Sequence, residues 1–261
     1  MSAALDEKAK QEALASMTLV EHLRELRRRL IKSVLAVTIA GTLSWWLYVP
    51  VMDWLTTLLR NTCPQALGPE HCQIIQTDPM QGLTTRFTIC AYGGVALAMP
   101  VLLWQIWRYI TPGLYRKERR LAVPFVVSSV LLFAGGVWLA LWVMPAALQW
   151  LASTGGNLAQ FYVPDKYVMF VIKVAIGFGI GFELPILLIF LQLIGLVTSR
   201  QLGKWRRYAV VGIVVLVALG PTGDPVSLFA QAVPMYLLYE IAILVGWLMT
   251  RKRKRSSGAT A

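Results

Sequence analysis

Long runs of apolar side chains without any charge constrain this chain more than any other feature. Residues 87–107 contain no charged side chain, and neither do residues 121–151. A helix needs about 20 mostly apolar residues to cross a hydrocarbon core of about 30 Å. Only 15% of the 261 residues are charged and 57% are hydrophobic, which is too little charge for the surface of a soluble domain. The sequence therefore predicts an integral membrane protein and excludes a disordered chain or a conventional soluble enzyme.

Six apolar segments predict an all-α bundle of six transmembrane helices within a single domain, residues 1–250. The predicted spans are residues 31–49, 87–107, 125–144, 168–197, 208–219 and 226–249. The fifth is short, because its 12 residues make a helix of about 18 Å. Residues 251–261 are interpreted as a basic, flexible cytoplasmic tail.

The basic residues are distributed very unevenly over the predicted loops. Of the 25 Lys and Arg, 21 lie before the first span, between the second and third, between the fourth and fifth, or after the sixth. Basic loops stay in the cytoplasm, so both termini are predicted to be cytoplasmic. The net charge of +12 then reflects topology and attraction to anionic lipid rather than nucleic-acid binding. The polar N-terminus and the long first apolar run also predict that no signal peptide is cleaved.

An amphipathic helix is predicted for residues 17–30, directly before the first span. Its apolar stripe consists of Leu19, Leu23, Leu26 and Leu30. Their spacing of three and four residues is typical of one face of a helix. The other faces carry charges, including Glu25 and Arg29, which can form an ordinary surface ion pair. From these residues alone, a solvated helix and a binding surface are both open.

A second acid stands in the short basic connection between the second and third spans. Glu118 is the only acid among four neighbouring bases, which are Arg116, Lys117, Arg119 and Arg120. This pattern indicates either a functional carboxylate or a positive-inside loop whose one acid eases charge repulsion.

Two further acids fall inside predicted spans. Glu183 lies at the middle of the fourth span, where a carboxyl costs a few kcal/mol and is a functional candidate by default. The alternative for Glu183 is a satisfied hydrogen bond between helices. Glu240 lies nearer the cytoplasmic end of the sixth span, and Asp224 precedes a proline in a glycine-rich segment typical of a turn.

The cysteines and histidines indicate no metal site. Cys63 and Cys72 lie in the first external loop, where an oxidising compartment permits a disulfide, although spacing alone does not establish its geometry. Cys90 is expected to pack within a helix. His22 and His71 are predicted on opposite sides of the membrane, and no Walker-type glycine loop predicts a nucleotide cofactor.

Four segments taken together resemble the TatC family, the polytopic receptor subunits of twin-arginine protein translocases. They are HLRELR at residues 22–27, LYRKERR at 114–120, FELP at 182–185, and Asp224 followed by FAQ at 229–231. The resemblance covers residues 19–249 in the same order and with six spans. The cysteine-containing external loop and the turn before Asp224 depart from the common family pattern.

The resemblance implies a cup-shaped receptor for twin-arginine signal peptides. Glu25 and Glu118 would receive the arginines, and the residues beside them would be Arg27, Tyr109 and Arg119. Contacts with small single-span subunits of the TatA and TatB type, or translocation itself, would involve Glu183, Pro185, Asp224, Gln231 and Glu240. Short fifth and sixth helices would line the side where these partners dock.

The resemblance also implies the setting in which the chain works. Folded cargo would cross the plasma membrane of a prokaryote at the expense of the proton-motive force, without catalysis by this chain and without a cofactor. Several copies would assemble in a receptor complex, with membrane lipids as further partners and no nucleic acid.

The membrane acids alone also permit a second function. A proton-coupled secondary transporter of a small solute would use Glu183 and Glu240 as a relay. This alternative leaves the two cytoplasmic acids unexplained, and the chain lacks the internal repeat of many transporters. Intramembrane hydrolysis is disfavoured, because the spans carry no nucleophile–base pair.

Overall fold

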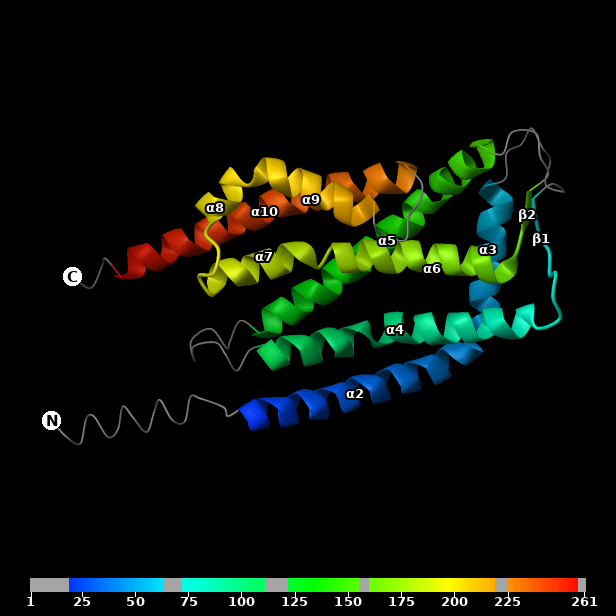
Figure 1. Cartoon of the computed structure of the whole chain (residues 1–261), viewed down its shortest axis with the longest axis horizontal. Helices are drawn as coiled ribbons and strands as arrows, with labels where there is room; N and C mark the ends of the chain where they lie inside the picture. The colour runs from blue at the N-terminus through cyan, green and yellow to red at the C-terminus, as the bar shows by residue number, and fades with distance from the viewer. Residues whose placement is uncertain (1–18, 63–71, 111–121, 155–159, 219–224, 258–261) are drawn as a thin grey trace.

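The computed structural model describes residues 19–62, 72–110, 122–154, 160–218 and 225–257 (Figure 1). Over these residues the chain is helical apart from two strands of three residues. The elements are α2 (Leu19–Trp46), α3 (Tyr48–Thr62), β1 (Cys72–Ile74), α4 (Gln81–Ile110), α5 (Ala122–Thr154), β2 (Gln160–Tyr162), α6 (Pro164–Gly181), α7 (Leu184–Leu193), α8 (Ser199–Lys204), α9 (Arg206–Ala218) and α10 (Pro225–Ser257).

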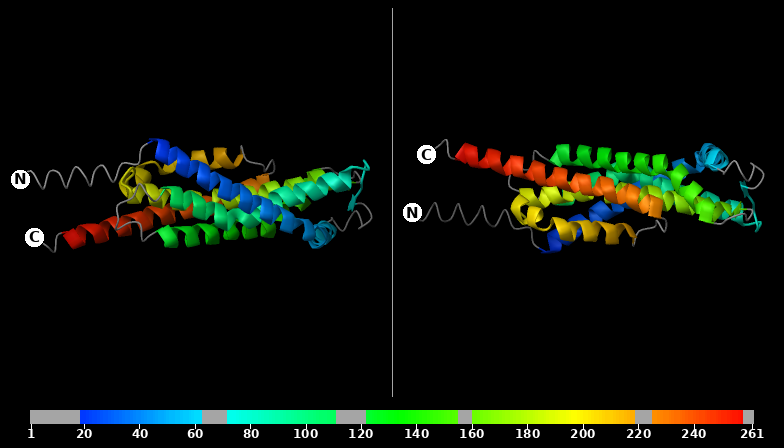
Figure 2. Two further views of the ribbon diagram at one scale, coloured as in Figure 1. Left: turned by 90° about the horizontal axis from the view of Figure 1, so that it is seen from below. Right: turned by 90° about the horizontal axis from the view of Figure 1, so that it is seen from above.

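The described helices form a bundle with several elements long enough to cross a bilayer. Four segments meet the length and hydropathy required, and they are Gln81–Tyr109, Val123–Thr154, Pro164–Leu193 and Pro225–Leu248. The bent pair α2 and α3 makes a fifth candidate. In edge-on views α2 and α9 lie on one face of the bundle and α5 lies on the other (Figure 2). The predicted all-helical architecture with membrane-spanning helices is therefore confirmed.

The first predicted span, residues 31–49, does not continue as one straight helix. The chain breaks at Leu47 and turns by 67° into α3, which crosses the ends of the long helices (Figure 1). Pro50 lies in the first turn of α3 and explains the break, because proline lacks an N–H and its ring clashes with the carbonyl four residues earlier. The Arg86 guanidinium lies 4.2 Å from the Trp45 ring centroid and 5.0 Å from that of Tyr48. These stacks hold the two sides of the bend together.

The fourth predicted span, residues 168–197, is also interrupted. It consists of α6 and α7, separated at Phe182 and Glu183. Pro185 occupies the first turn of α7, where its missing N–H is tolerated, so the ladder of helical hydrogen bonds restarts there.

α10 contains the predicted sixth span, residues 226–249, but it is a long helix where a short one was expected, and it includes the first part of the segment predicted as a basic tail. α10 has 33 residues and continues through the basic run to Ser257. Its polar residues do not break it, because Gln231 and Glu240 have partners on neighbouring helices. Lys and Arg are also good helix formers, which favours continuation of α10 beyond the membrane. The predicted short fifth helix corresponds to α9, which has 13 residues.

The helices approach one another most closely at glycines. A Cβ on Gly94 of α4 would lie 2.6 Å from the Gly41 Cα of α2, and one on Gly136 of α5 would lie 2.7 Å from the Phe178 carbonyl oxygen of α6. Backbone contact of this kind is available only where no side chain intervenes. These two contacts bring α2 against α4 and α5 against α6.

Polar contacts stabilise the end of the bundle at which α3, β1 and β2 lie. The Tyr167 hydroxyl of α6 donates to the Leu55 carbonyl of α3 at 3.0 Å, and Gln81 donates to Asp165 at 3.0 Å. β1 pairs with β2 in parallel, with Ile74 opposite Tyr162. Outside this end, the lipid-facing surface of α2 is strongly apolar, with exposed Ile31, Val34, Leu35, Ile39 and Leu43.

We expect Gly136→Ala to destabilise the bundle and its neighbour Gly135→Ala to leave stability unchanged or slightly higher. An alanine at 136 would strike the backbone of Phe178 and Gly179, whereas position 135 has nothing within 4 Å. Overpacking of this kind costs about 1–3 kcal/mol, which corresponds to a fall in Tm of roughly 5 °C. Thermal unfolding of both variants in detergent measures the difference. Equal Tm values would show that α5 and α6 do not pack this closely.

Candidate functional site

A basic cavity lies where the first turns of α2 face the last turns of α4. Its volume is about 460 Å³. The lining residues are Arg24, Glu25, Arg28, Arg29 and Lys32 from α2 and Gln105 and Arg108 from α4. Among the described residues of this lining, Glu25 is thus the single acid beside five cations.

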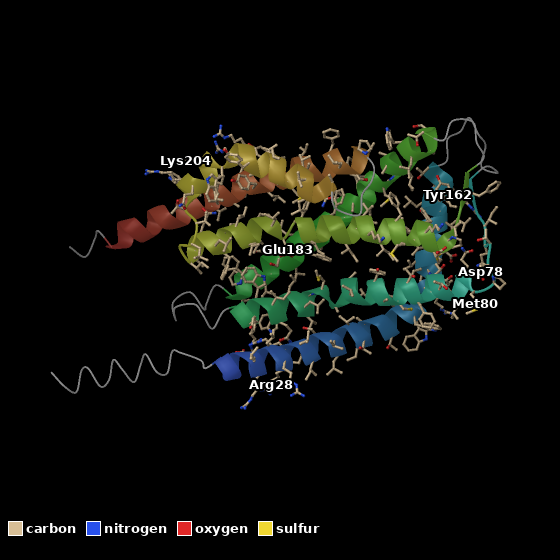
Figure 3. The ribbon with its side chains drawn as sticks, in the orientation of Figure 1. Arg28, Asp78, Met80, Tyr162, Glu183 and Lys204 are labelled. Atoms are coloured by element: carbon tan, nitrogen blue, oxygen red, sulfur yellow. The ribbon has the colours of Figure 1, made fainter. Side chains whose placement is uncertain are left out.

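Helical geometry explains how α2 contributes five side chains to this cavity. Residues three or four positions apart lie on one face of a helix, and Glu25, Arg28, Arg29 and Lys32 follow that spacing. The close packing of α2 on α4 turns this face toward Gln105 and Arg108. Figure 3 labels Arg28 at this end of the bundle, the same end as Lys204 of α8, while Asp78 and Tyr162 lie at the opposite end.

Glu25 is engaged by Arg29. The Arg29 Nε donates to Glu25 Oε1 at 3.1 Å, and Nη2 donates to the same oxygen. Arg29 Nη1 also points at the Gln105 side-chain oxygen at 3.5 Å. The second carboxylate oxygen, Oε2, is buried and has no hydrogen-bond partner among the described residues. Burying a carboxylate oxygen without a hydrogen-bond donor costs free energy. A ligand that supplied a donor to this oxygen would remove that cost.

Of the predicted signal-site residues, the structure places one, Glu25, in the lining of this cavity. Tyr109 is half-buried in the last turn of α4, one residue beyond Arg108. Arg27 is exposed and does not line the cavity. Glu118 and Arg119 lie outside the described residues.

The sequence analysis missed Gln105 and Arg108. Gln105 is the one polar amide in an otherwise apolar stretch of α4, and this was the only local signal for it. Its role depends on which helix packs beside α4, and no local pattern reveals that.

Glu183 lies at the break between α6 and α7, near the middle of the bundle's length (Figure 3). The Ser129 hydroxyl of α5 interacts with its carboxyl group, and Ser129 also accepts a hydrogen bond from Trp107 Nε1 at 2.8 Å. The other carboxyl oxygen, Oε1, is buried without a partner in the described part of the chain. Trp107 itself stacks with Phe125 and Phe190. A polar chain therefore connects α4, α5 and the α6–α7 break inside an apolar bundle.

The other predicted membrane residues have structural partners. Gln231 of α10 donates to the Gly177 carbonyl of α6 at 2.9 Å, and Pro185 is buried in α7. Glu240 accepts from Arg206 at 2.8 Å and from the Tyr236 hydroxyl at 2.9 Å.

Glu183 interacts with Ser129, whereas Glu240 bonds to Arg206 and Tyr236, so the described contacts contain no direct relay between the two acids. Asp224 and Cys63 lie outside the described residues, and of Cys72 only the backbone, in β1, is described. The predicted disulfide and the role of Asp224 therefore stay predictions. Among the described side chains, no group of three or more His, Cys, Asp and Glu could hold a metal ion.

Comparison with known proteins identifies the family. The family model described as "Sec-independent protein translocase protein (TatC)" matches residues 21–234. A protein of that name from Aquifex aeolicus is 37% identical over 243 residues, which cover 91% of this chain and 98% of the relative. Another from Frankia casuarinae is 35% identical over 247 residues, covering 92% of this chain and 68% of the relative.

A crystal structure titled as the twin arginine translocase receptor TatC has the same fold. It is 35% identical, covers 88% of this chain and 100% of its own, and superposes with a TM-score of 0.74. Sequence, fold and the order of the motifs agree, and the chain belongs to the TatC family, the multi-pass membrane receptors of the twin-arginine, Sec-independent protein translocase.

Proposed function

We propose that the basic cavity at the junction of α2 and α4 receives the twin-arginine signal of cargo proteins, with Glu25 as the group that binds an arginine. The observation that carries this proposal is a half-buried carboxylate that, among the described residues, has an oxygen without a hydrogen-bond partner and is the only acid in a cavity lined by five cations. Such a carboxylate is the one place in the cavity where an added cation is attracted rather than repelled.

The chemistry of a carboxylate explains a preference for arginine. A guanidinium presents a planar fork of donors that matches carboxylate oxygens, whereas a lysine ammonium is a compact point charge. The cations around Glu25 also oppose the entry of any basic segment that does not form this hydrogen-bonded pair. Arginine selectivity would then come from geometry and not from charge alone.

Glu118 is proposed as the second carboxylate for the arginine pair. The connection that carries it follows α4 directly after Ile110, and Arg108 in the last turn of α4 lines the cavity. Eight residues lie between Tyr109 and Glu118, a connection short enough to return to the same site. Tyr109, Arg27 and Arg119 are proposed to border the bound signal.

The cavity is proposed to face the cytoplasm of a prokaryotic cell, with six spans and both termini on that side. The start of α2 and the end of α10 lie at one end of the bundle (Figure 1), and the sequence is rich in Lys and Arg at both of these helix ends. Basic segments remain cytoplasmic. α9 would be the short fifth span, because its 13 residues extend about 20 Å against about 30 Å of hydrocarbon.

Translocation is proposed to involve the polar residues in the membrane and the proton-motive force. Glu183 has a buried, unpartnered oxygen, which suits an added donor from a single-span subunit of the TatA or TatB type. Pro185, Gln231, Asp224 and Glu240 would shape the surface on which such subunits assemble. These roles need neither catalysis nor a cofactor from this chain.

We expect the double variant Glu25→Gln, Glu118→Gln to lose binding of a twin-arginine signal peptide. Losing one charge-assisted hydrogen bond of about 1.5–3 kcal/mol raises Kd roughly ten- to a hundredfold. Fluorescence anisotropy with the receptor in lipid nanodiscs measures Kd for twin-arginine and twin-lysine peptides. Asp53→Asn on α3 is the control, because it removes an exposed carboxylate at the other end of the bundle. Wild-type affinity in the double variant would contradict the site.

We expect Glu183→Ala to leave signal binding within about twofold of wild type and to abolish most transport. Glu183 lies at the α6–α7 break, away from the cavity lining, and its interaction with Ser129 links α5 to that break. Transport of a folded cargo into inverted membrane vesicles provides one readout, and peptide binding in nanodiscs provides the other. A large loss of peptide binding would place Glu183 in the signal site instead.

A further inference from the structure

The carboxylate proposed to receive the signal arginine already holds an arginine from its own helix. Arg29 directs both Nε and Nη2 to Glu25 Oε1. This is the interaction that an incoming guanidinium would make, supplied by a residue one helical turn away. Both side chains are largely withdrawn from solvent, with 14% of Arg29 and 21% of Glu25 exposed.

The other carboxylate oxygen of Glu25, Oε2, is not accessible to an incoming guanidinium. Oε2 is buried, so a ligand cannot reach it without movement of the groups around it. Arg29 is the group that must move, because it occupies Oε1, the oxygen that an incoming guanidinium would otherwise bind. Its Nη1 already lies 3.5 Å from the Gln105 oxygen of α4. That amide gives Arg29 a second acceptor when it leaves Glu25.

We propose that in the free receptor Arg29 occupies the position on Glu25 that the signal arginine takes in the complex. A signal peptide then binds by displacing Arg29 from Glu25. This inference rests on the proposed function of the cavity. In the free receptor Arg29 satisfies the half-buried carboxylate and keeps it from pairing with passing cations. In the complex, the guanidinium of the signal takes its place on Oε1, and Arg29 turns toward Gln105.

A resident competitor has a specific thermodynamic consequence. The apparent Kd is the intrinsic Kd divided by the fraction of receptor in which Glu25 is vacant. That fraction is the same for every ligand, so Arg29 raises the apparent Kd of the twin-arginine and the twin-lysine peptide by one common factor. The ratio of the two affinities is set by Glu25 and its hydrogen-bond geometry. Arg29 thus lowers the affinity for every signal peptide by the same factor, and Glu25 determines the preference for arginine over lysine.

The test compares Arg29→Gln with Arg28→Gln in nanodiscs. Both variants remove one positive charge from the same cavity, but only Arg29 bonds to Glu25. We expect Arg29→Gln to lower the Kd of the twin-arginine and the twin-lysine peptide by about fivefold each, with their ratio unchanged. Arg28→Gln measures the effect of charge alone and should change Kd by about twofold or less. Arg29→Lys, which keeps the charge without the fork, should lie between wild type and Arg29→Gln.

Three outcomes would overturn the proposal. Arg29→Gln and Arg28→Gln could change Kd equally, Arg29→Gln could weaken binding, or it could change the ratio between the two peptides. Weaker binding would make Arg29 a support for Glu25 rather than its competitor. If Arg29→Gln fails to fold, as judged by its Tm, Arg29→Lys carries the same test.

Failure of the proposed function itself would look different. In that case wild-type receptor would not bind the twin-arginine peptide, or the Glu25→Gln variant would bind it as well as wild type does. Loss of binding in Glu25→Gln together with no gain in Arg29→Gln would overturn only the role of Arg29.

Discussion

Every polar group inside this bundle must find its partner within the protein, because hydrocarbon offers none. The long helices satisfy their own backbones, and polar side chains then bond across helices. Gln231 donates to the Gly177 carbonyl, Gln192 donates to the Ala242 carbonyl at 2.9 Å, and Trp107 donates to Ser129. The close glycine contacts bring the helices near enough for such bonds. Where this requirement is incompletely met, at Glu25 and Glu183, the unpartnered oxygens mark candidate sites.

These two sites lie on the same helix framework. α4 carries Gln105 and Arg108 at the basic cavity, and between them Trp107, which bonds to Ser129 beside Glu183. A change at the end of α4 therefore has a direct physical route to the α6–α7 break. The route consists of one hydrogen bond and an aromatic cluster, and variants of Ser129 that keep the fold can measure any coupling through it.

In the proposed exchange, the Arg29–Glu25 ion pair gives the receptor a means to exclude unwanted cations. A vacant half-buried carboxylate would be costly, and a wide-open one would bind basic segments indiscriminately. Pairing with Arg29 removes that cost in the free state and makes binding an exchange of one guanidinium for another. Among the described residues, the lining cations come from both α2 and α4, so the field around this exchange depends on both helices.

The sequence by itself determined the membrane class, the basic segments and the family motifs, because hydropathy and charge are local properties, and it indicated Glu25 and Glu183 as candidate site residues. It did not reveal the bend at Leu47, the length of α10 or the place of Gln105 opposite Arg29. Tertiary structure decided these features, because they depend on which helix packs beside which. A pairing between residues 29 and 105 arises only when α2 and α4 meet.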